Sequence, residues 1–147
     1  MDFMQDSLES GRKFRTLNVI DDYNRESLAI EVDVSLTGER VVRVLESIIE
    51  WRGIPKEIRS DNGPEFISDA VAQFCETKQI KRSFIQPGKP MQNAYVERFN
   101  KTLREDVLDA YIFESLSQVR EIADSWQKIT MKIILMNHLE ASVLKCI

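Results

Sequence analysis

Three acidic residues stand in surroundings that suit metal chemistry. Asp2 lies in the apolar, strand-like segment Met1–Met4, where a charge is costly unless it faces a ligand. Asp61 follows a short strand pattern and precedes a Gly-Pro turn, at the kind of strand end where α/β folds usually bind ligands. Glu97 lies in a helical pattern. Because hard oxygen ligands suit Mg²⁺ or Mn²⁺, these carboxylates are candidate metal ligands.

Two such ions, held about 4 Å apart, can activate an attacking hydroxyl and stabilise the leaving oxygen in a phosphodiester displacement. The alternative interpretation is three unrelated surface acids, since the chain has 24 acidic residues and any triple is easily assembled. Residue chemistry alone leaves both interpretations open.

The distribution of charge bears on a nucleic-acid partner. The net charge of −4 argues against one, because such proteins usually present a basic face. However, the segment from Lys78 to Arg104 contains seven basic residues and one acid, Glu97. The segment from Glu105 to Asp124 reverses this balance. Runs of charge are often only solvated faces, but this basic run surrounds a candidate ligand.

Length and composition predict a single globular domain. The chain has 147 residues, of which 43% are hydrophobic and 30% charged. No apolar run approaches the roughly 20 residues of a membrane span, and no signal-peptide pattern is present. The two cysteines, Cys75 and Cys146, lie far apart, which favours a reducing cytoplasm.

Hydrophobic periodicity predicts three strands, then a helix, a strand, a helix, a strand and two helices, an order typical of an α/β layered domain. The first helix is predicted to begin after Thr37 and to end at Gly53. The other expected elements are strands at Met1–Met4, Phe14–Asp21, Ser27–Val34, Glu57–Ser60 and Lys81–Ile85, and helices at Ile67–Cys75, Gln92–Tyr111 and Leu116–Lys128.

Three motifs extend this interpretation. Ser60–Phe66 (SDNGPEF) resembles the second-aspartate motif of retroviral-integrase-like DDE transposases, and Ile85–Asn100 (IQPGKPMQNAYVERFN) resembles their glutamate motif. Met1–Met4 together with Thr16–Asp22 resembles their first-aspartate segment, and 35 residues lie between Asp61 and Glu97. The chain is most similar to the orfB-type transposase catalytic subunit of bacterial insertion sequences, from Met1 to about Lys128.

This resemblance implies an RNase H-like fold, with a mixed five-stranded sheet and helices on both faces. It implies that Asp2, Asp61 and Glu97 are the catalytic residues and hold two Mg²⁺ or Mn²⁺ ions. The expected activity is metal-dependent cutting and joining of DNA at the ends of an insertion sequence. The expected setting is the bacterial cytoplasm, near the nucleoid and away from membranes, with a homo-oligomer as the active form.

The resemblance also implies residues that contact DNA. Arg104, seven residues after Glu97, matches the basic residue that the family directs at a DNA phosphate, and Lys101 fits the same role less specifically. Lys89 in the Pro-Gly-Lys-Pro loop is a further candidate. Asn93 matches a motif residue that positions the loop or DNA, although a polar residue at a helix start explains it equally well.

Both ends depart from the family pattern. Family members carry further strand residues and a DNA-binding region before the first aspartate, whereas only Met1 precedes Asp2 here. Residues 1–128 are therefore expected to form an N-terminally truncated core. After Trp126 the family continues to Tyr-Asn and then Arg-Pro-His-x-Ser-Leu-Gly. The codons for residues 129–141 can also be read in the frame that starts at the third base of each codon. In that frame they permit the sequence Tyr-Asn-Glu-Asn-Asn-Pro-His-Glu-Ser-Leu-Gly-Gly. Residues 129–147 are therefore predicted to be a frameshifted tail.

Three functional hypotheses follow. The chain is a two-metal polynucleotidyl transferase core, or a catalytically inactive remnant that folds, dimerises or binds DNA weakly. The third hypothesis is an RNase H-type nuclease with the same fold, and the glutamate motif on the long helix favours transposition over it.

Overall fold

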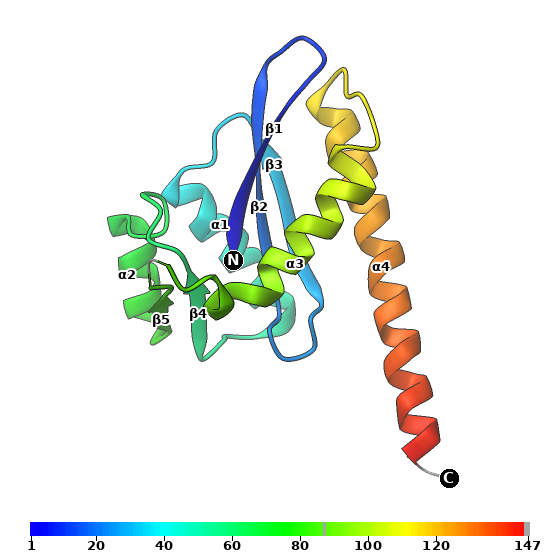
Figure 1. The fold of residues 1–147 in the computed structure, drawn as a ribbon. Coiled ribbons are helices and arrows are strands. Elements are labelled where there is room, and N and C mark those ends of the chain that lie inside the picture. The colour runs from blue at the N-terminus through cyan, green and yellow to red at the C-terminus, as the bar shows by residue number, and fades with distance from the viewer. Residues whose placement is uncertain (87, 146–147) are drawn as a thin grey trace.

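The computed structural model describes residues 1–86 and 88–145 (Figure 1). Five strands and four α-helices occur in the predicted order, with a 3₁₀ turn before the third helix and a π-helical turn after it. The elements are β1 (Asp2–Ser7), β2 (Lys13–Ile20), β3 (Ser27–Asp33), α1 (Gly38–Arg52), β4 (Glu57–Ser60), α2 (Asp69–Lys78), β5 (Lys81–Phe84), a 3₁₀ turn (Pro90–Asn93), α3 (Ala94–Leu103), a π turn (Arg104–Leu108) and α4 (Leu116–Lys145).

The strands form two sheets, where one five-stranded sheet was predicted. β1, β2 and β3 pair antiparallel in that order, and β4 pairs with β5 in parallel. The α-amino group of Met1 donates a hydrogen bond of 2.7 Å to the carbonyl oxygen of Arg59, which brings the start of β1 to the end of β4. The ladder between β1 and β2 begins at the pair Asp2–Asn18. The part of β2 beyond Asn18 therefore has β3, and not β1, as its paired neighbour.

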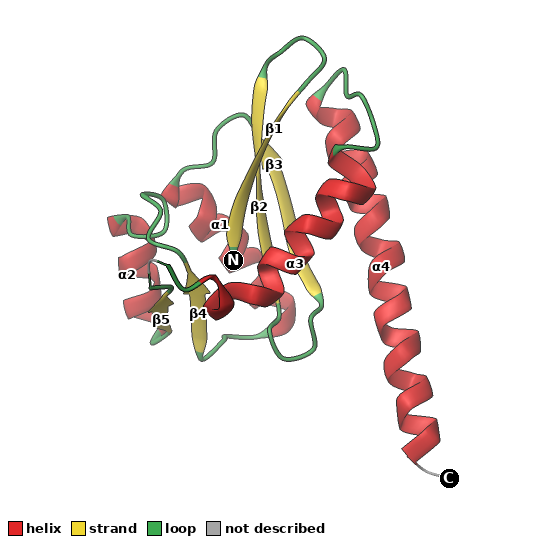
Figure 2. Ribbon diagram, in the orientation of Figure 1, coloured by secondary structure: helices red, strands yellow, loops and turns green. Residues whose placement is uncertain are grey.

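Helices cover both faces of the antiparallel sheet, as predicted (Figure 2). Side chains alternate across a strand, so β2 contributes to two separate apolar clusters. Leu17 packs with α1 and α2 in one cluster, whose fully buried members include Val41 and Val71. Phe14 packs on the opposite face of the sheet, against Leu103 at the end of α3 and against the start of α4. As a result, α3 lies across the face of the sheet that carries Asp2 and Asn18.

Local capping explains where the first two helices begin. The hydroxyl of Thr37 accepts a hydrogen bond from the backbone N–H of Arg40, and Gly53 ends α1 with φ of 93°, as predicted. The second helix begins later than predicted because Ser68 caps it and accepts from Val71 N–H.

The long helix predicted from Gln92 to Tyr111 is interrupted at both ends. A 3₁₀ turn with Pro90 at its first position precedes α3, and α3 runs on into the π turn. In that turn the N–H of Asp109 donates to the carbonyl of Arg104, five residues earlier. Because the π turn is wider than an α-helical turn, the consecutive apolar residues Val107 and Leu108 both lie buried against the sheet.

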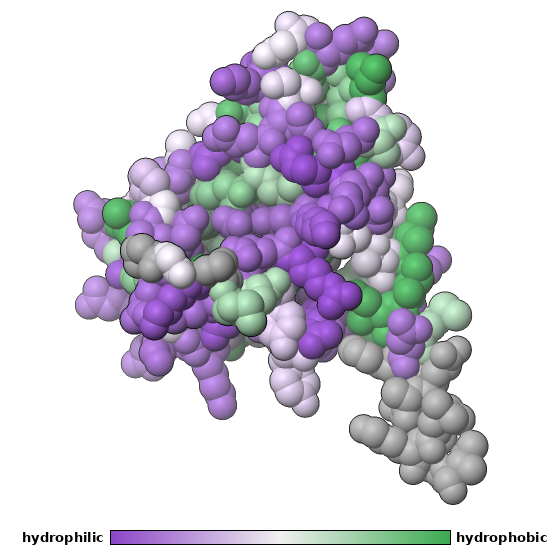
Figure 3. Space-filling view, in the orientation of Figure 1, coloured by the Kyte–Doolittle hydropathy of each residue, from purple (hydrophilic) through white to green (hydrophobic). Residues whose placement is uncertain are grey.

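The last helix, α4, continues without interruption through the boundary predicted at Lys128. Its later part extends away from the rest of the molecule (Figure 1). Large apolar side chains are exposed there, including Ile129, Ile133 and Met136, and a hydrophobic patch lies on this helix in Figure 3. None of the helices described is both long enough and apolar enough to cross a membrane.

Candidate active site

Asp2 is held by a chain of side-chain amides that crosses three elements. The fully buried Asn18 on β2 donates from Nδ2 to Oδ1 of Asn100 on α3, at 2.7 Å. Asn100 in turn donates from its own Nδ2 to Oδ2 of Asp2, at 2.9 Å. The other carboxylate oxygen of Asp2 accepts from the backbone N–H of Phe3. These contacts fix the Asp2 side chain against α3 at the start of β1.

Asp61 lies close enough to Asp2 to act on it electrostatically. Partial burial raises the pKa of the Asp2 carboxyl, the hydrogen bond from Phe3 N–H opposes this, and the negative charge of Asp61 raises the pKa further. Asp61 itself is exposed after β4, and its Oδ1 accepts from the N–H of Gly63 at 2.8 Å. A Cβ at position 63 would lie 3.0 Å from that oxygen, so glycine allows the tight turn that holds Asp61.

Glu97 lies in the first turn of α3 and is exposed. It stands three residues before Asn100, and residues three apart share a helix face, so Glu97 lies one turn from the residue that contacts Asp2. No group of three Asp, Glu, His or Cys side chains in the described part of the chain is gathered closely enough to hold a metal ion. The structure thus places Asp61 near enough to Asp2 for their charges to interact, but it does not gather Glu97 with them into one metal-binding cluster.

The loop that carries Asp61 packs beside the loop that leads to α3. The N–H of Ile85 donates to the carbonyl of Ser60 at 3.0 Å, which extends the pairing of β4 and β5 by one residue. A shallow hollow is lined by both loops, with Asp61 and Gly63 on one side and Gly88 and Lys89 on the other. Lys89 is exposed and thus shares an open surface with Asp61.

The other predicted DNA-contacting residues differ in how exposed their side chains are and in how many contacts they make within the protein. Lys101 is highly exposed and lies 4.0 Å from Glu105. Arg104, by contrast, donates to the carbonyl of Gln5 at 2.8 Å and approaches Asp109 at 3.4 Å. Asn93 is buried, at 5% exposure, immediately before α3 and makes no side-chain capping hydrogen bond. In this structure Lys101 faces solvent, while Arg104 and Asn93 are engaged with or enclosed by the protein.

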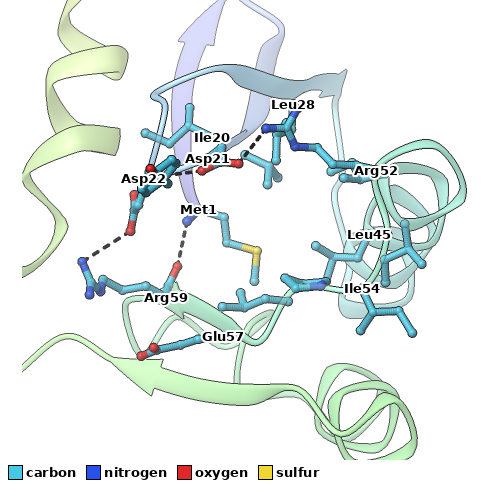
Figure 4. Close-up of a pocket in the computed structure, with 17 residues that line it drawn as sticks. Met1, Ile20, Asp21, Asp22, Leu28, Leu45, Arg52, Ile54, Glu57 and Arg59 are labelled. Atoms are coloured by element: carbon cyan, nitrogen blue, oxygen red, sulfur yellow. Dashed lines mark hydrogen bonds and ion pairs between the residues drawn. The ribbon is translucent and has the colours of Figure 1, made fainter.

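A cavity of about 480 Å³ is lined by Met1, the turn after β2, α1 and the strand β4 (Figure 4). Burial lowers the pKa of the Met1 α-amino group to about 6, against the opposing charges of Asp22, Asp2 and Asp61. Arg52 binds Asp21 across this cavity at 2.7 Å, and Asp22 pairs with Arg59 at 3.4 Å. These ion pairs tie the turn after β2 to α1 and β4 around the candidate site.

Asn18 and Asn100 are the residues that the sequence analysis missed. Both lie inside motifs that resemble those of the family, but the motifs alone predicted no role for either residue. A signal was present in the strand pattern, because Asn18 interrupts the apolar run Leu17–Ile20 of β2. A buried amide needs a hydrogen-bonding partner, and here the partner comes from a residue distant in sequence.

Comparisons with known proteins identify the family to which the chain belongs. Two family models described as Integrase core domain match residues 1–90 and residues 78–129. The chain is 41% identical over 128 residues to a 39.2 kDa protein of insertion element IS476 from Xanthomonas euvesicatoria. It is 38% identical over 128 residues to a 31.7 kDa protein of insertion element IS407 from Burkholderia multivorans. Each alignment covers 87% of this chain, but only 37% and 46% of those two relatives.

Solved structures show the same fold. The catalytic core domain of HTLV-2 integrase in complex with magnesium, in its trimeric form, superposes with a TM-score of 0.61 over 83% of this chain and 80% of that chain, at 21% identity. A chain of the simian T-cell lymphotropic virus intasome superposes with a TM-score of 0.68 over 83% of this chain and 44% of that chain, also at 21% identity. The α/β fold described above is thus that of retroviral integrase catalytic cores, which are RNase H-like, and the protein belongs to the integrase core domain family.

Proposed function

We propose that this chain is a DNA transposase catalytic core that cuts and joins DNA strands with Asp2, Asp61 and Glu97. The observation that carries the proposal is the contact between Asn100 and Asp2, because it holds α3, the helix that carries Glu97, against the strand that carries Asp2. Membership of the integrase core domain family and similarity to insertion-element proteins support the same activity.

The donor set suits a divalent cation. Asp2 and Asp61 offer hard carboxylate oxygens. Burial, and after it the negative charge of Asp61, raises the pKa of the Asp2 carboxyl, and a bound cation would offset the repulsion between the two acids. Asp2, Asp61 and Glu97 would hold two Mg²⁺ or Mn²⁺ ions, which supply charge stabilisation to the phosphodiester under attack. The HTLV-2 core with the same fold was solved with magnesium, which supports this assignment.

The chain's own residues orient the site. Asn100 directs one oxygen of Asp2, and Gly63 N–H directs one oxygen of Asp61. Lys89, which lines the hollow beside Asp61, and Lys101 on α3 are both exposed and would bind DNA phosphates. Arg104, whose side chain is 38% exposed, and Asn93, which directly precedes α3, complete the proposed DNA-contacting residues.

Two further parts of the proposal concern the assembly and the tail. The active form is a homo-oligomer on the ends of a bacterial insertion sequence and its target DNA, in the cytoplasm with the nucleoid; HTLV-2 integrase cores of dimeric and trimeric form share the fold. Residues 129–147 are a frameshifted tail outside the core. The family match that ends at residue 129 supports this boundary.

The second candidate function is a catalytically inactive remnant that folds and binds DNA weakly. One observation favours it: the described residues hold no ready-made cluster of three metal-binding side chains. The two candidates differ in whether Glu97 can complete the site when metal and DNA are present.

Strand-transfer and nicking assays with a synthetic insertion-sequence end and Mg²⁺ or Mn²⁺ distinguish them. For an active core we expect metal-dependent products, which Glu97→Gln lowers by at least about 100-fold. Glu105→Gln is the matched control, since it makes the same change two turns later on an exposed residue, and we expect it to retain activity. Activity that survives Glu97→Gln would overturn the site assignment. Absence of products from the unmodified chain with both metals would favour the inactive remnant.

A further inference from the structure

A second hollow lies on the other side of α3 from Asp2, between the turn that joins β2 to β3 and the helix α4. Its volume is about 400 Å³. Three side chains give it its chemical character: Arg25 from the turn, and Tyr95 and Arg98 from α3. We call it the arginine hollow. No aspartate or glutamate is among the described residues that line it.

Arg25 is held in place by Tyr95. Its guanidinium carbon lies 4.5 Å from the centre of the Tyr95 ring, and its Nη2 donates to the Tyr95 hydroxyl at 3.3 Å. The backbone at Arg25 has φ of 63°, a left-handed conformation that non-glycine residues adopt uncommonly. The turn therefore directs this arginine at α3, and Tyr95 orients its planar fork.

The charges of Arg25 and Arg98 are not neutralised within the described structure. Neither is among the residues that form ion pairs there. Arg52, near the same turn, differs sharply because two carboxylates bind it at 2.6 and 2.7 Å. In a chain of net charge −4, two unpaired guanidinium groups in an acid-free hollow form a local positive site.

The geometry of α3 connects this site to the carboxylates. Tyr95, Arg98 and Thr102 are spaced three and four residues apart and all line the arginine hollow. Glu97 and Asn100 are also three apart and lie on a different face of the helix, toward Asp2. Lys101 lies between these two faces, at 100° per residue, and is exposed. Basic side chains thus follow the surface of α3 from the carboxylates to the hollow.

We propose that the arginine hollow binds backbone phosphates of a DNA strand whose neighbouring nucleotides lie at the Asp2–Asp61 site. This inference rests on the proposed function, since it extends the DNA path across α3. Guanidinium groups suit this ligand because their planar N–H donors match phosphate oxygens and remain charged at all physiological pH values. Tyr95 acts as a positioning residue that holds Arg25 toward the phosphate.

Equilibrium DNA binding of the full chain, measured by fluorescence anisotropy of a labelled duplex over a range of salt concentrations, tests this. The variants are Arg25→Asn, chosen because asparagine tolerates positive φ, and Arg98→Gln. We expect each to weaken binding several-fold at low salt and to lower the slope of log affinity against log salt by about 0.9, the value for one phosphate contact. Tyr95→Ala should weaken binding in the same way, whereas Tyr95→Phe keeps the ring under Arg25 and should have a smaller effect.

Arg43→Gln is the matched control, because Arg43 is an exposed arginine on α1, which covers the opposite face of the sheet. Circular dichroism melts of every variant report whether the fold is retained. If DNA binds and the Arg25 and Arg98 variants behave like Arg43→Gln, the arginine hollow is refuted while the proposed function stands. If the unmodified chain binds no DNA even at low salt, both fail. Loss of strand transfer in Glu97→Gln with unchanged DNA binding concerns the catalytic proposal alone.

Discussion

The Nδ2 of Asn100 donates to the carboxylate of Asp2 at 2.9 Å, across 98 positions of sequence. Because Asn100 also accepts from the buried Asn18, one amide joins β2, α3 and β1. The position of Glu97 relative to Asp2 therefore depends on the side chain of Asn100, which lies one helical turn after Glu97.

Replacing Asn100 by alanine should destabilise the protein. The change leaves the buried Nδ2 of Asn18 without its acceptor, and such a loss costs about 1–3 kcal/mol of unfolding free energy. Urea denaturation followed by circular dichroism measures this. Thr102→Ala serves as the control, since Thr102 is exposed on the same helix, and we expect a change within about 0.5 kcal/mol. An Asn100→Ala variant as stable as the control would show that the amide chain contributes little.

Replacing Gly63 by alanine should impair the candidate site more than the fold. The added Cβ would lie 3.0 Å from Oδ1 of Asp61, so the carboxylate must move, while the turn itself lies at the surface. We expect a drop of about ten-fold or more in metal-dependent strand transfer, since a displaced ligand positions the reacting groups poorly. The melting temperature should fall only slightly. Asn62→Ala, beside it and exposed, should have a smaller effect on transfer, and equal activity of the two variants would contradict this role of Gly63.

Acid should weaken the fold through its ion-paired carboxylates. At Asp21, burial tends to raise the carboxyl pKa, but hydrogen bonds from Arg52 and from two backbone N–H groups outweigh it and lower the pKa. The N–H of Val34, with Arg40, lowers the pKa of Asp33. A carboxyl whose pKa is lower in the folded state stabilises the fold above its unfolded pKa, near 3.9, and loses this contribution as pH falls through the folded value.

Urea midpoints measured from pH 6 to pH 2 should therefore fall most steeply below about pH 4. Asp21→Asn should flatten part of this dependence, because it removes one of the groups with a lowered pKa. The same pH profile for Asp21→Asn and for the unmodified chain would exclude the pair of Asp21 and Arg52 as a source of acid sensitivity.

Removal of residues 129–147 should improve solubility at little cost in stability. Ile129, Ile133 and Met136 are each more than half exposed, so their loss removes apolar surface that faces water. We expect the 1–128 chain to unfold within about 1 kcal/mol of the full chain and to aggregate less on heating. Light scattering and urea denaturation compare the two. A large loss of stability would mean that the end of α4 is part of the core.

The sequence of elements followed from local patterns, and the prediction of Asp61 and Glu97 as site residues rests on such patterns too. The helix α1 has the bounds expected from Thr37 and Gly53, and β4 has its predicted bounds, because caps, glycine stops and short apolar runs act over a few residues. Asp61 and Glu97 stand out for the same reason, since each lies inside a contiguous motif. The family itself was therefore predictable from the sequence.

The tertiary structure decided what those residues contact. The partner of Asn18 is 82 positions away, and the carbonyl that Arg104 binds is 99 positions away, so both depend on how α3 packs across the sheet. The DNA contact of Arg104 stays a prediction from its distance to Glu97, whereas its bond to the Gln5 carbonyl on β1 is known only from the packing. The division into two sheets likewise depends on which strand edges meet, and helix or strand periodicity carries no information about that.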